Sequence, residues 1–310
     1  MHVYALKRVL QFIPTIFFIT LIMFVLLNVL PGSAAYLAVD QRKAPDPKLI
    51  AQLEKEWGLD KPVYVRYLNY LKGLATGDLG KSFLRKEDVS HILAERIRPT
   101  LELAFASIVI AVAVGLPLGF ISALRQGTWL DTLSMIGAVS GISIPQFWLG
   151  ILLMFFLSVK VRIFPTSGYG DGNIMNLILP AVSLGVGYMA LIARTTRAAV
   201  IDVLTMDFIR TARSKGLSEL LVNSRHVFQN TMILVLTTVG LQFGSLIGST
   251  VIVEKLFSWP GIGSLLVDSI YQRDIPVTQG CILVIILIFL IVNLVVDLLY
   301  AVIDPRIKYQ

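Results

Sequence analysis

The sequence has little charge and few residues able to hold a metal. Charged residues make up 15% of the 310 residues, hydrophobic residues make up 55%, and mean hydropathy is +0.76. A soluble domain carries about a quarter charged residues, so this composition argues against an ordinary soluble protein. The single cysteine, Cys281, excludes an internal disulfide, and His2, His91 and His226 are too few and too scattered for a metal site.

A nucleotide-binding loop is missing too. The segment 77–82 ends in Gly-Lys-Ser, but Ala75 stands where a phosphate-binding loop needs its first glycine. No Ser-His-Asp set and no pair of carboxylates has a placement suited to catalysis. We therefore expect no enzyme activity, no cofactor and no metal in this chain, so any ATP would be used by a partner.

Long uncharged segments are what the sequence does contain. Six windows of at least 22 residues carry no charge: 9–39, 103–124, 132–159, 172–193, 227–253 and 275–296. A membrane-spanning helix needs about 20 mostly apolar residues. The windows predict an all-α polytopic membrane protein with six spans, at about Val9–Leu30, Leu101–Leu124, Leu133–Val159 (kinked near Pro145), Ile178–Ala193, Met232–Val253 and Gly280–Ile303. The first apolar run is longer than a signal peptide core, so we expect it to be retained.

The distribution of basic residues predicts the orientation. With the N-terminus inside, the inner segments hold eleven Lys and Arg residues, against four in the two short outer loops. This bias places both termini in the cytoplasm. The net charge of +7 then reflects topology, and we expect no nucleic-acid binding.

We expect a single transmembrane domain over 1–310, with an extracytoplasmic insert at 31–100 and a cytoplasmic loop at 194–231. Helical stretches at 47–57 and 63–74 predict that the insert folds around a small core. Its candidate core residues are Trp57, Tyr64, Tyr67, Tyr70 and several leucines.

The inner loop contains a pattern that predicts a short helix. Apolar residues recur among charged ones at spacings that suit one helical stripe: Leu204, Phe208, Ile209, Ala212 and Leu217. Gly216 follows where a C-terminal helix cap would lie. Composition alone favours a simpler interpretation, a basic loop that obeys the positive-inside rule.

The residues Asp-Phe-Ile-Arg-Thr-Ala-Arg-Ser-Lys-Gly-Leu at 207–217 carry a family resemblance. They are similar to the cytoplasmic signature of permease subunits of bacterial ABC importers, in the dipeptide/oligopeptide (and nickel) permease family. Further similar segments are 30–32, 77–83, 98–104, 143–150, 257–263, 273–280 and 304–306. The chain departs from the family at Leu220, Leu221, Val222 and Gln229, where more basic residues are expected, and this concerns the contact with a partner.

The resemblance implies half of a heterodimeric translocation pore in a bacterial cytoplasmic membrane. The implied partners are a paralogous permease, two ATPase subunits that hold ATP and magnesium, an extracytoplasmic solute-binding protein and a di- or oligopeptide cargo. Nickel or oligosaccharide cargo are alternatives. An ion-coupled secondary transporter is a different class, but it should show an inverted repeat with interrupted helices, and we find none.

The resemblance also implies that a cytoplasmic helix couples the chain to its ATPase. The coupling residues would be Asp207, Phe208, Arg210, Thr211, Ala212, Arg213, Lys215, Gly216 and Leu217.

Polar residues within the spans are candidates for the translocation path, because such residues face a bundle interior or cavity. They are Gln146, Gln242, Asn293 and Asp297. For Asp297 the favoured alternative is structural, as a partner for a basic residue near the inner end of the last span. Trp129, Trp148 and Trp259 lie near predicted span ends, which favours an interfacial aromatic belt.

Overall fold

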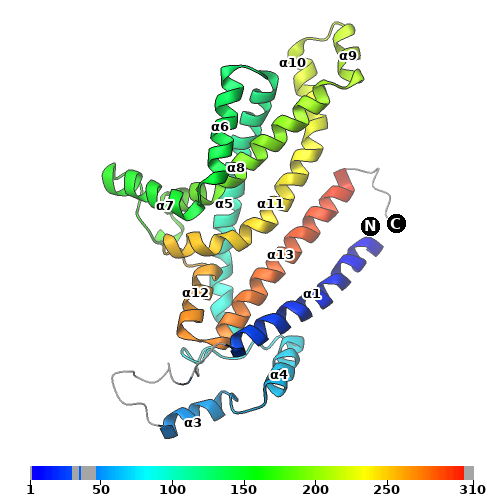
Figure 1. Cartoon of the computed structure of the whole chain (residues 1–310). Helices are drawn as coiled ribbons and strands as arrows, with labels where there is room; N and C mark the ends of the chain where they lie inside the picture. Colours follow the sequence, from blue (N-terminus) through cyan, green and yellow to red (C-terminus); the bar gives the residue numbers. More distant parts are fainter. Residues whose placement is uncertain (1, 30–34, 36–46, 304–310) are drawn as a thin grey trace.

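The computed structural model describes residues 2–29, 35 and 47–303, and helices dominate the described chain (Figure 1). One isolated bridge joins Lys81 to Asp88. Two of the segments that resemble the permease family lie outside the described residues, namely 30–32 and 304–306. The basic residues Arg306 and Lys308 lie outside them too. The order is α1 (His2–Val29), α3 (Pro47–Glu56), α4 (Val63–Thr76), α5 (Val89–Leu124), α6 (Trp129–Ser143), α7 (Gln146–Leu153), η1 (Met154–Lys160), η2 (Gly170–Gly172), α8 (Ile174–Leu204), α9 (Asp207–Ser214), α10 (Glu219–Leu221), η3 (Val222–Val227), α11 (Phe228–Leu256), α12 (Ile262–Gln272) and α13 (Ile275–Ile303).

Five described helices are long and apolar enough to cross a bilayer, namely α1, α5, α8, α11 and α13. Each contains most of a predicted span, and most extend beyond the prediction. The extension is largest in α5, whose 36 residues reach about 54 Å at 1.5 Å per residue, against a hydrocarbon core of about 30 Å. These helices therefore carry their ends well outside the apolar layer.

The third predicted span is not a continuous helix. The chain breaks between α6 and α7 and turns by 104°, so that the pair makes a sixth span only if the two pieces count as one. Pro145 caps the start of α7, and Ile144 before it is extended, with ψ of 123°. A proline disfavours helical backbone in the residue before it, which explains why the helix ends there. The prediction of a kink near Pro145 was correct in place, and the structure shows a bend of 104° there.

The helices α5 and α8 pack against each other at very short distance. A Cβ atom built on Gly119 of α5 would lie 2.2 Å from the carbonyl oxygen of Ala193, and one on Gly115 would lie 2.5 Å from that of Met189. Small residues let helix backbones approach in this way inside membranes. The central buried cluster is built around this pair and includes Leu103, Leu184 and Ile247.

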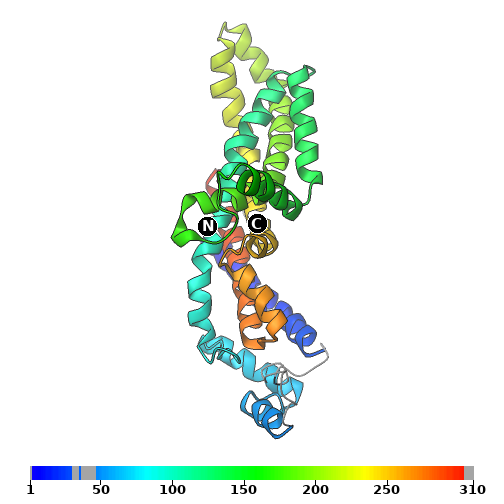
Figure 2. The same cartoon turned by 90° about the vertical axis from the view of Figure 1, so that its left-hand side faces the viewer.

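Two extremities of the molecule are distinct. Helices α9 and α10 lie at one extremity and α3 and α4 at the opposite one, and both views agree (Figure 1, Figure 2). Helices α1 and α13 lie side by side in opposite directions, and Arg8 of α1 contacts Asp297 of α13 at 3.1 Å. We refer to the two extremities as the α9 end and the insert end.

The described part of the insert does not form a core of its own. No residue of α3 or α4 is buried, and Tyr64 is 69% exposed. The aromatic rings divide: Tyr67 lies 5.1 Å from Phe24 of α1, whereas Trp57 stacks at 4.3 Å on Phe83, which belongs to the insert. The predicted small core is therefore reduced to the Trp57–Phe83 stack, and Tyr67 packs on α1 instead.

Candidate functional site

Helix α9 is a short helix whose ends are fixed by local chemistry. Asp207 lies in its first turn and Arg213 in its last, which suits the helix dipole. Gly216 adopts φ of +77°, its N–H donates to the carbonyl of Arg213 (2.9 Å), and the N–H of Leu217 donates to that of Ala212 (3.4 Å). This pair of hydrogen bonds is a Schellman motif. The predicted cap at Gly216 is confirmed.

One edge of α9 is buried against the long helices. Ile209 is fully buried and Ala212 is 7% exposed. They belong to a cluster from α5, α8, α9 and η3 that comprises Ala123, Val200, Val203, Ile209, Ala212, Val222 and Val227, with Leu204 and Leu217 packed against it. Phe208 departs from the predicted stripe, since it is 40% exposed. Successive residues of a helix point about 100° apart, so burial centred on Ile209 and Ala212 leaves Phe208 outside.

The other face of α9 is exposed and basic. Arg210, Thr211, Arg213, Lys215 and Gly216 are exposed. A hollow of about 300 Å³ lies beside them, lined by Phe208, Thr211, Ala212, Lys215, Leu217 and His226. Arg213 makes a two-point contact with Glu219, at 2.8 and 3.1 Å. The predicted residues thus divide into a buried edge and a free face.

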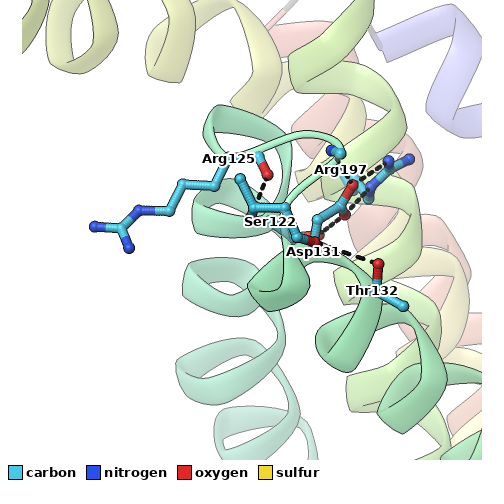
Figure 3. A network of polar contacts seen from close by, with 7 residues as sticks. Ser122, Arg125, Asp131, Thr132 and Arg197 are labelled. Carbon is cyan, nitrogen blue, oxygen red and sulfur yellow. Dashed lines mark hydrogen bonds and ion pairs between the residues drawn. The ribbon is translucent and has the colours of Figure 1, made fainter.

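A buried carboxylate holds the turn between α5 and α6 at the same end. Asp131 is 5% exposed and accepts two hydrogen bonds from the guanidinium of Arg197 on α8, at 2.7 and 2.8 Å (Figure 3). Ser122 donates its hydroxyl to the same carboxylate at 2.5 Å, and the N–H of Gly127 donates at 3.0 Å. The neighbouring Arg125 points its guanidinium away (Figure 3). The network locks the α5–α6 turn onto α8 close to the base of α9.

A second buried carboxylate lies at the junction of α11, α12 and α5. Glu254 is fully buried, accepts the hydroxyl proton of Thr100 (2.7 Å) and accepts the N–H of Ser264 (2.9 Å). Thr100 in turn accepts the N–H of Ile262 at 2.8 Å. The backbone passes so close that a Cβ on Gly261 would lie 2.3 Å from the Glu254 carboxylate. We call this arrangement the Glu254 clamp.

Trp259 and Tyr169 complete the Glu254 clamp. The indole N–H of Trp259 donates to the carbonyl of Pro99 at 2.8 Å, and Trp259 is 1% exposed. Tyr169 meets the Trp259 ring edge-on at 4.8 Å and donates its hydroxyl to Glu102 at 2.6 Å, which raises the pKa of Tyr169. The aromatic-belt prediction is therefore wrong for Trp259, since a fully hydrogen-bonded indole inside the protein is not at a lipid interface.

Comparisons with known proteins agree with this architecture. Residues 115–309 match the family model described as binding-protein-dependent transport system inner membrane component, and residues 1–104 match the model of its N-terminal part. The chain belongs to this family. It is a membrane-embedded permease subunit of an ABC importer, a transport component and not an enzyme, and the family works with ATPase and binding-protein partners.

Relatives and solved structures extend the comparison. The permease is 44% identical over 307 residues to the glutathione transport system permease protein GsiC of Escherichia coli strain K12, which covers 99% of both chains. The protein of the same name from Shigella flexneri serotype 5b is 43% identical over the same length. The fold resembles an inward-facing MetNI methionine ABC transporter, with a TM-score of 0.58, 18% identity, and 69% of this chain and 97% of that one covered. It also resembles an amino acid ABC transporter with histidines, with a TM-score of 0.56, 14% identity, and 68% and 94% covered.

The four polar residues predicted in the spans of the permease lie on three helices, and no hydrogen bond or ion pair joins any two of them in the part of the chain that the structure describes. Gln146 begins α7 at the break, and its backbone carbonyl oxygen accepts a hydrogen bond from the Ser183 hydroxyl (2.7 Å). Gln242 lies on α11 and Asn293 on α13. Asp297 pairs with Arg8 at 3.1 Å, which is the structural role weighed for it.

Two networks escaped the sequence interpretation of the permease. The sequence interpretation singled out neither Asp131 nor Arg197. The sequence feature that could have indicated this pair was an acid at the start of one apolar run and an arginine at the end of another. Glu254 follows the last residue of an uncharged window, and the signal there was the tight Trp-Pro-Gly-x-Gly sequence after it.

Proposed function

We propose that this permease forms half of the translocation path of an importer for small peptides and receives the motion of an ATPase through α9. The cargo proposal is supported by the 44% identity to permeases named for glutathione, which is itself a tripeptide. It also agrees with the signature at 207–217. In this proposal α9 and both termini face the cytoplasm, as the distribution of basic residues favours.

The observation that carries the coupling role is the split between the two faces of α9. The buried edge, Ile209 and Ala212, is fixed in a cluster that includes Ala123 of α5 and Val200 of α8. The exposed basic face and its hollow stay free for a partner. A partner that moves the free face must therefore move the ends of α5 and α8 with it, because packed interiors do not deform continuously.

The proposed assembly supplies what this chain does not. A paralogous permease would complete the path, two ATPase subunits would bind and hydrolyse ATP with magnesium, and an extracytoplasmic solute-binding protein would deliver the peptide. Gln146, Gln242 and Asn293 remain our candidates for residues that line the path.

A matched pair of glycine substitutions tests the coupling role. Gly216 and Gly77 both have φ of +77°, both follow the end of a helix, and at neither would an added Cβ meet another atom within 4 Å. Valine at either position suffers the same backbone strain, of about 1–2 kcal/mol. We expect Gly216→Val to lower ATPase stimulation by loaded binding protein severalfold in an assembled complex. Gly77→Val, at the insert end, should lower it much less.

Two results would contradict the coupling role. Equal stimulation in the Gly216→Val and wild-type complexes would show that α9 geometry is irrelevant to coupling. An equal loss in both glycine variants would show that strain alone lowers activity. Mass spectrometry of the purified complex and its bound ligand tests the partners and the cargo separately.

A further inference from the structure

A cavity of about 680 Å³ lies where the insert meets α1 and α13. Phe24 of α1 and Gln279 of α13 contribute to its wall from the spans, and the remaining wall comes mainly from α3, α4 and the segments that follow them. The apolar span of α1 ends at Asn28 and that of α13 begins at Ile275. The cavity is therefore at the depth where the hydrocarbon core gives way to lipid headgroups.

The wall of this cavity is strongly cationic. Five basic side chains line it, Lys55, Lys61, Arg66, Lys81 and Lys86, against one carboxylate, Glu56. In the described part of the chain, Lys81 is the one among these five that forms an ion pair, with Asp88 at 3.8 Å. Arg66 lies over the ring of Phe24 at 5.9 Å, and burial lowers its pKa. The cavity wall thus carries more positive than negative charge.

Two residues of the cavity wall, Tyr70 and Gln279, also carry a buried hydrogen-bonding atom that has no partner in the described structure. Gln279 is 6% exposed, and its side-chain amide nitrogen has no acceptor in the described structure. The hydroxyl of Tyr70 is equally unpartnered, and burial together with Tyr67 raises its pKa to about 12, so it keeps its proton as a donor. A buried donor left without an acceptor costs about 1–3 kcal/mol. Cations and unpaired donors around one cavity are the chemistry of an anion site.

We propose that this cavity binds the phosphate of an anionic phospholipid from the leaflet that faces the insert. The cavity lies at the ends of the apolar spans of α1 and α13, and this position favours a lipid over a soluble anion. Apolar surface continues from Phe24 along the same face of α1 to Phe17, about two turns further into the span, which is 43% exposed and offers a path for an acyl chain. The proposal holds whatever the cargo is, because none of these residues belongs to α9 or to the candidate path.

Lipid retention by the full chain in its complex tests the proposal. The complex, purified in mild detergent, would be titrated with phosphatidylglycerol, phosphatidylcholine or inorganic phosphate, and bound lipid would be counted by native mass spectrometry. We expect retention of phosphatidylglycerol only. The variant Lys61→Gln/Arg66→Gln/Lys86→Gln should retain at least about tenfold less, since one charged hydrogen bond is worth about a factor of ten. The control Lys72→Gln, an exposed position on α4 outside the cavity, should retain as much as wild type.

Several outcomes would overturn the proposal. Equal retention of phosphatidylcholine and phosphatidylglycerol would remove the role of charge. Full displacement of phosphatidylglycerol by inorganic phosphate would assign the cavity to a free anion. If the triple variant does not fold, Gln279→Leu removes one donor alone and should lower retention between about two- and tenfold. Unchanged retention in Gln279→Leu would also count against a phosphate at this place.

Discussion

Two regions of the permease, the α9 end and the Glu254 clamp, each bury a carboxylate, but they surround it with different partners. At the α9 end, Asp131 of α6 faces the guanidinium of Arg197 of α8, and the two residues are 66 positions apart in sequence. In the Glu254 clamp, the carboxylate of Glu254 receives a hydroxyl and backbone N–H groups. Asp131 is stabilised by a charge from a distant helix, whereas Glu254 is stabilised by neutral donors, one of them held by a tight turn.

This difference indicates how each region opposes separation of its helices. The Arg197 contact joins α6 to α8, so separation of these helices would leave a charge in an apolar surrounding. The clamp joins α11 to the start of α12 through close approaches at Gly261 and Gly263. It joins α5 to both through the hydrogen bonds of Thr100. The α9 end is therefore protected by electrostatics against helix separation, and the clamp by sterically defined hydrogen bonds.

Removal of Asp131 should have the largest effect. Asp131→Ala leaves the Arg197 guanidinium without its partner, and breaking such a buried pair costs about 3 kcal/mol. The thermal midpoint of the purified permease would report this loss. The double variant Asp131→Leu/Arg197→Met should recover much of it, because it removes both charges. A single variant as stable as wild type would break the comparison at the α9 end.

The Glu254 clamp should lose less when its hydroxyl is removed. Thr100→Val keeps the shape of the side chain but leaves an oxygen of Glu254 and the N–H of Ile262 without partners. We expect a loss of about 2 kcal/mol. Thr100→Ser retains the hydroxyl and should lose less than half as much. Equal midpoints for the valine and serine variants would mean that these hydrogen bonds do not hold the clamp.

The contact between α5 and α8 lies between the α9 end and the Glu254 clamp, and its stability should respond to one added methyl group. Gly119→Ala places a Cβ 2.2 Å from the Ala193 carbonyl oxygen, and the overpacking should cost about 1.5 kcal/mol after the gain in helix propensity. Gly137→Ala on α6 meets no atom within 4 Å and should be neutral or slightly stabilising. The same thermal midpoint measures both variants, and a reversed order would contradict close packing at Gly119.

The smallest effect is expected at the surface of the α9 end. Glu219→Gln removes the partner of Arg213, but both side chains are exposed, at 62% and 45%. Such pairs contribute about 0–1 kcal/mol, so the midpoint should stay within a degree or two of wild type. A loss as large as that of Asp131→Ala would show that burial does not decide the strength of ion pairs here.

Patterns local in sequence predicted the fold best. Uncharged windows located the five long helices, and the run before Gly216 located both α9 and its cap. Interactions between distant segments were not predictable in this way. The partners of Asp131, Glu254 and Trp259 come from other helices, and hydrophobic periodicity carries no information about which helices meet. Pro145 indicated a bend, but the 104° turn depends on what the two pieces contact.

The length of α5 has a mechanical consequence. Its first residue, Val89, lies beside α13 at the insert end, and Ala123 near its last turn lies in the cluster that holds α9. The close contacts with α8, from Ser107 to Gly119, lie closer to the α9 end. From their midpoint, the arm toward Val89 is about 36 Å and the arm toward Leu124 about 16 Å, at 1.5 Å per residue. A rigid tilt of α5 about that midpoint would therefore move its insert end about twice as far as its α9 end, and in the opposite direction.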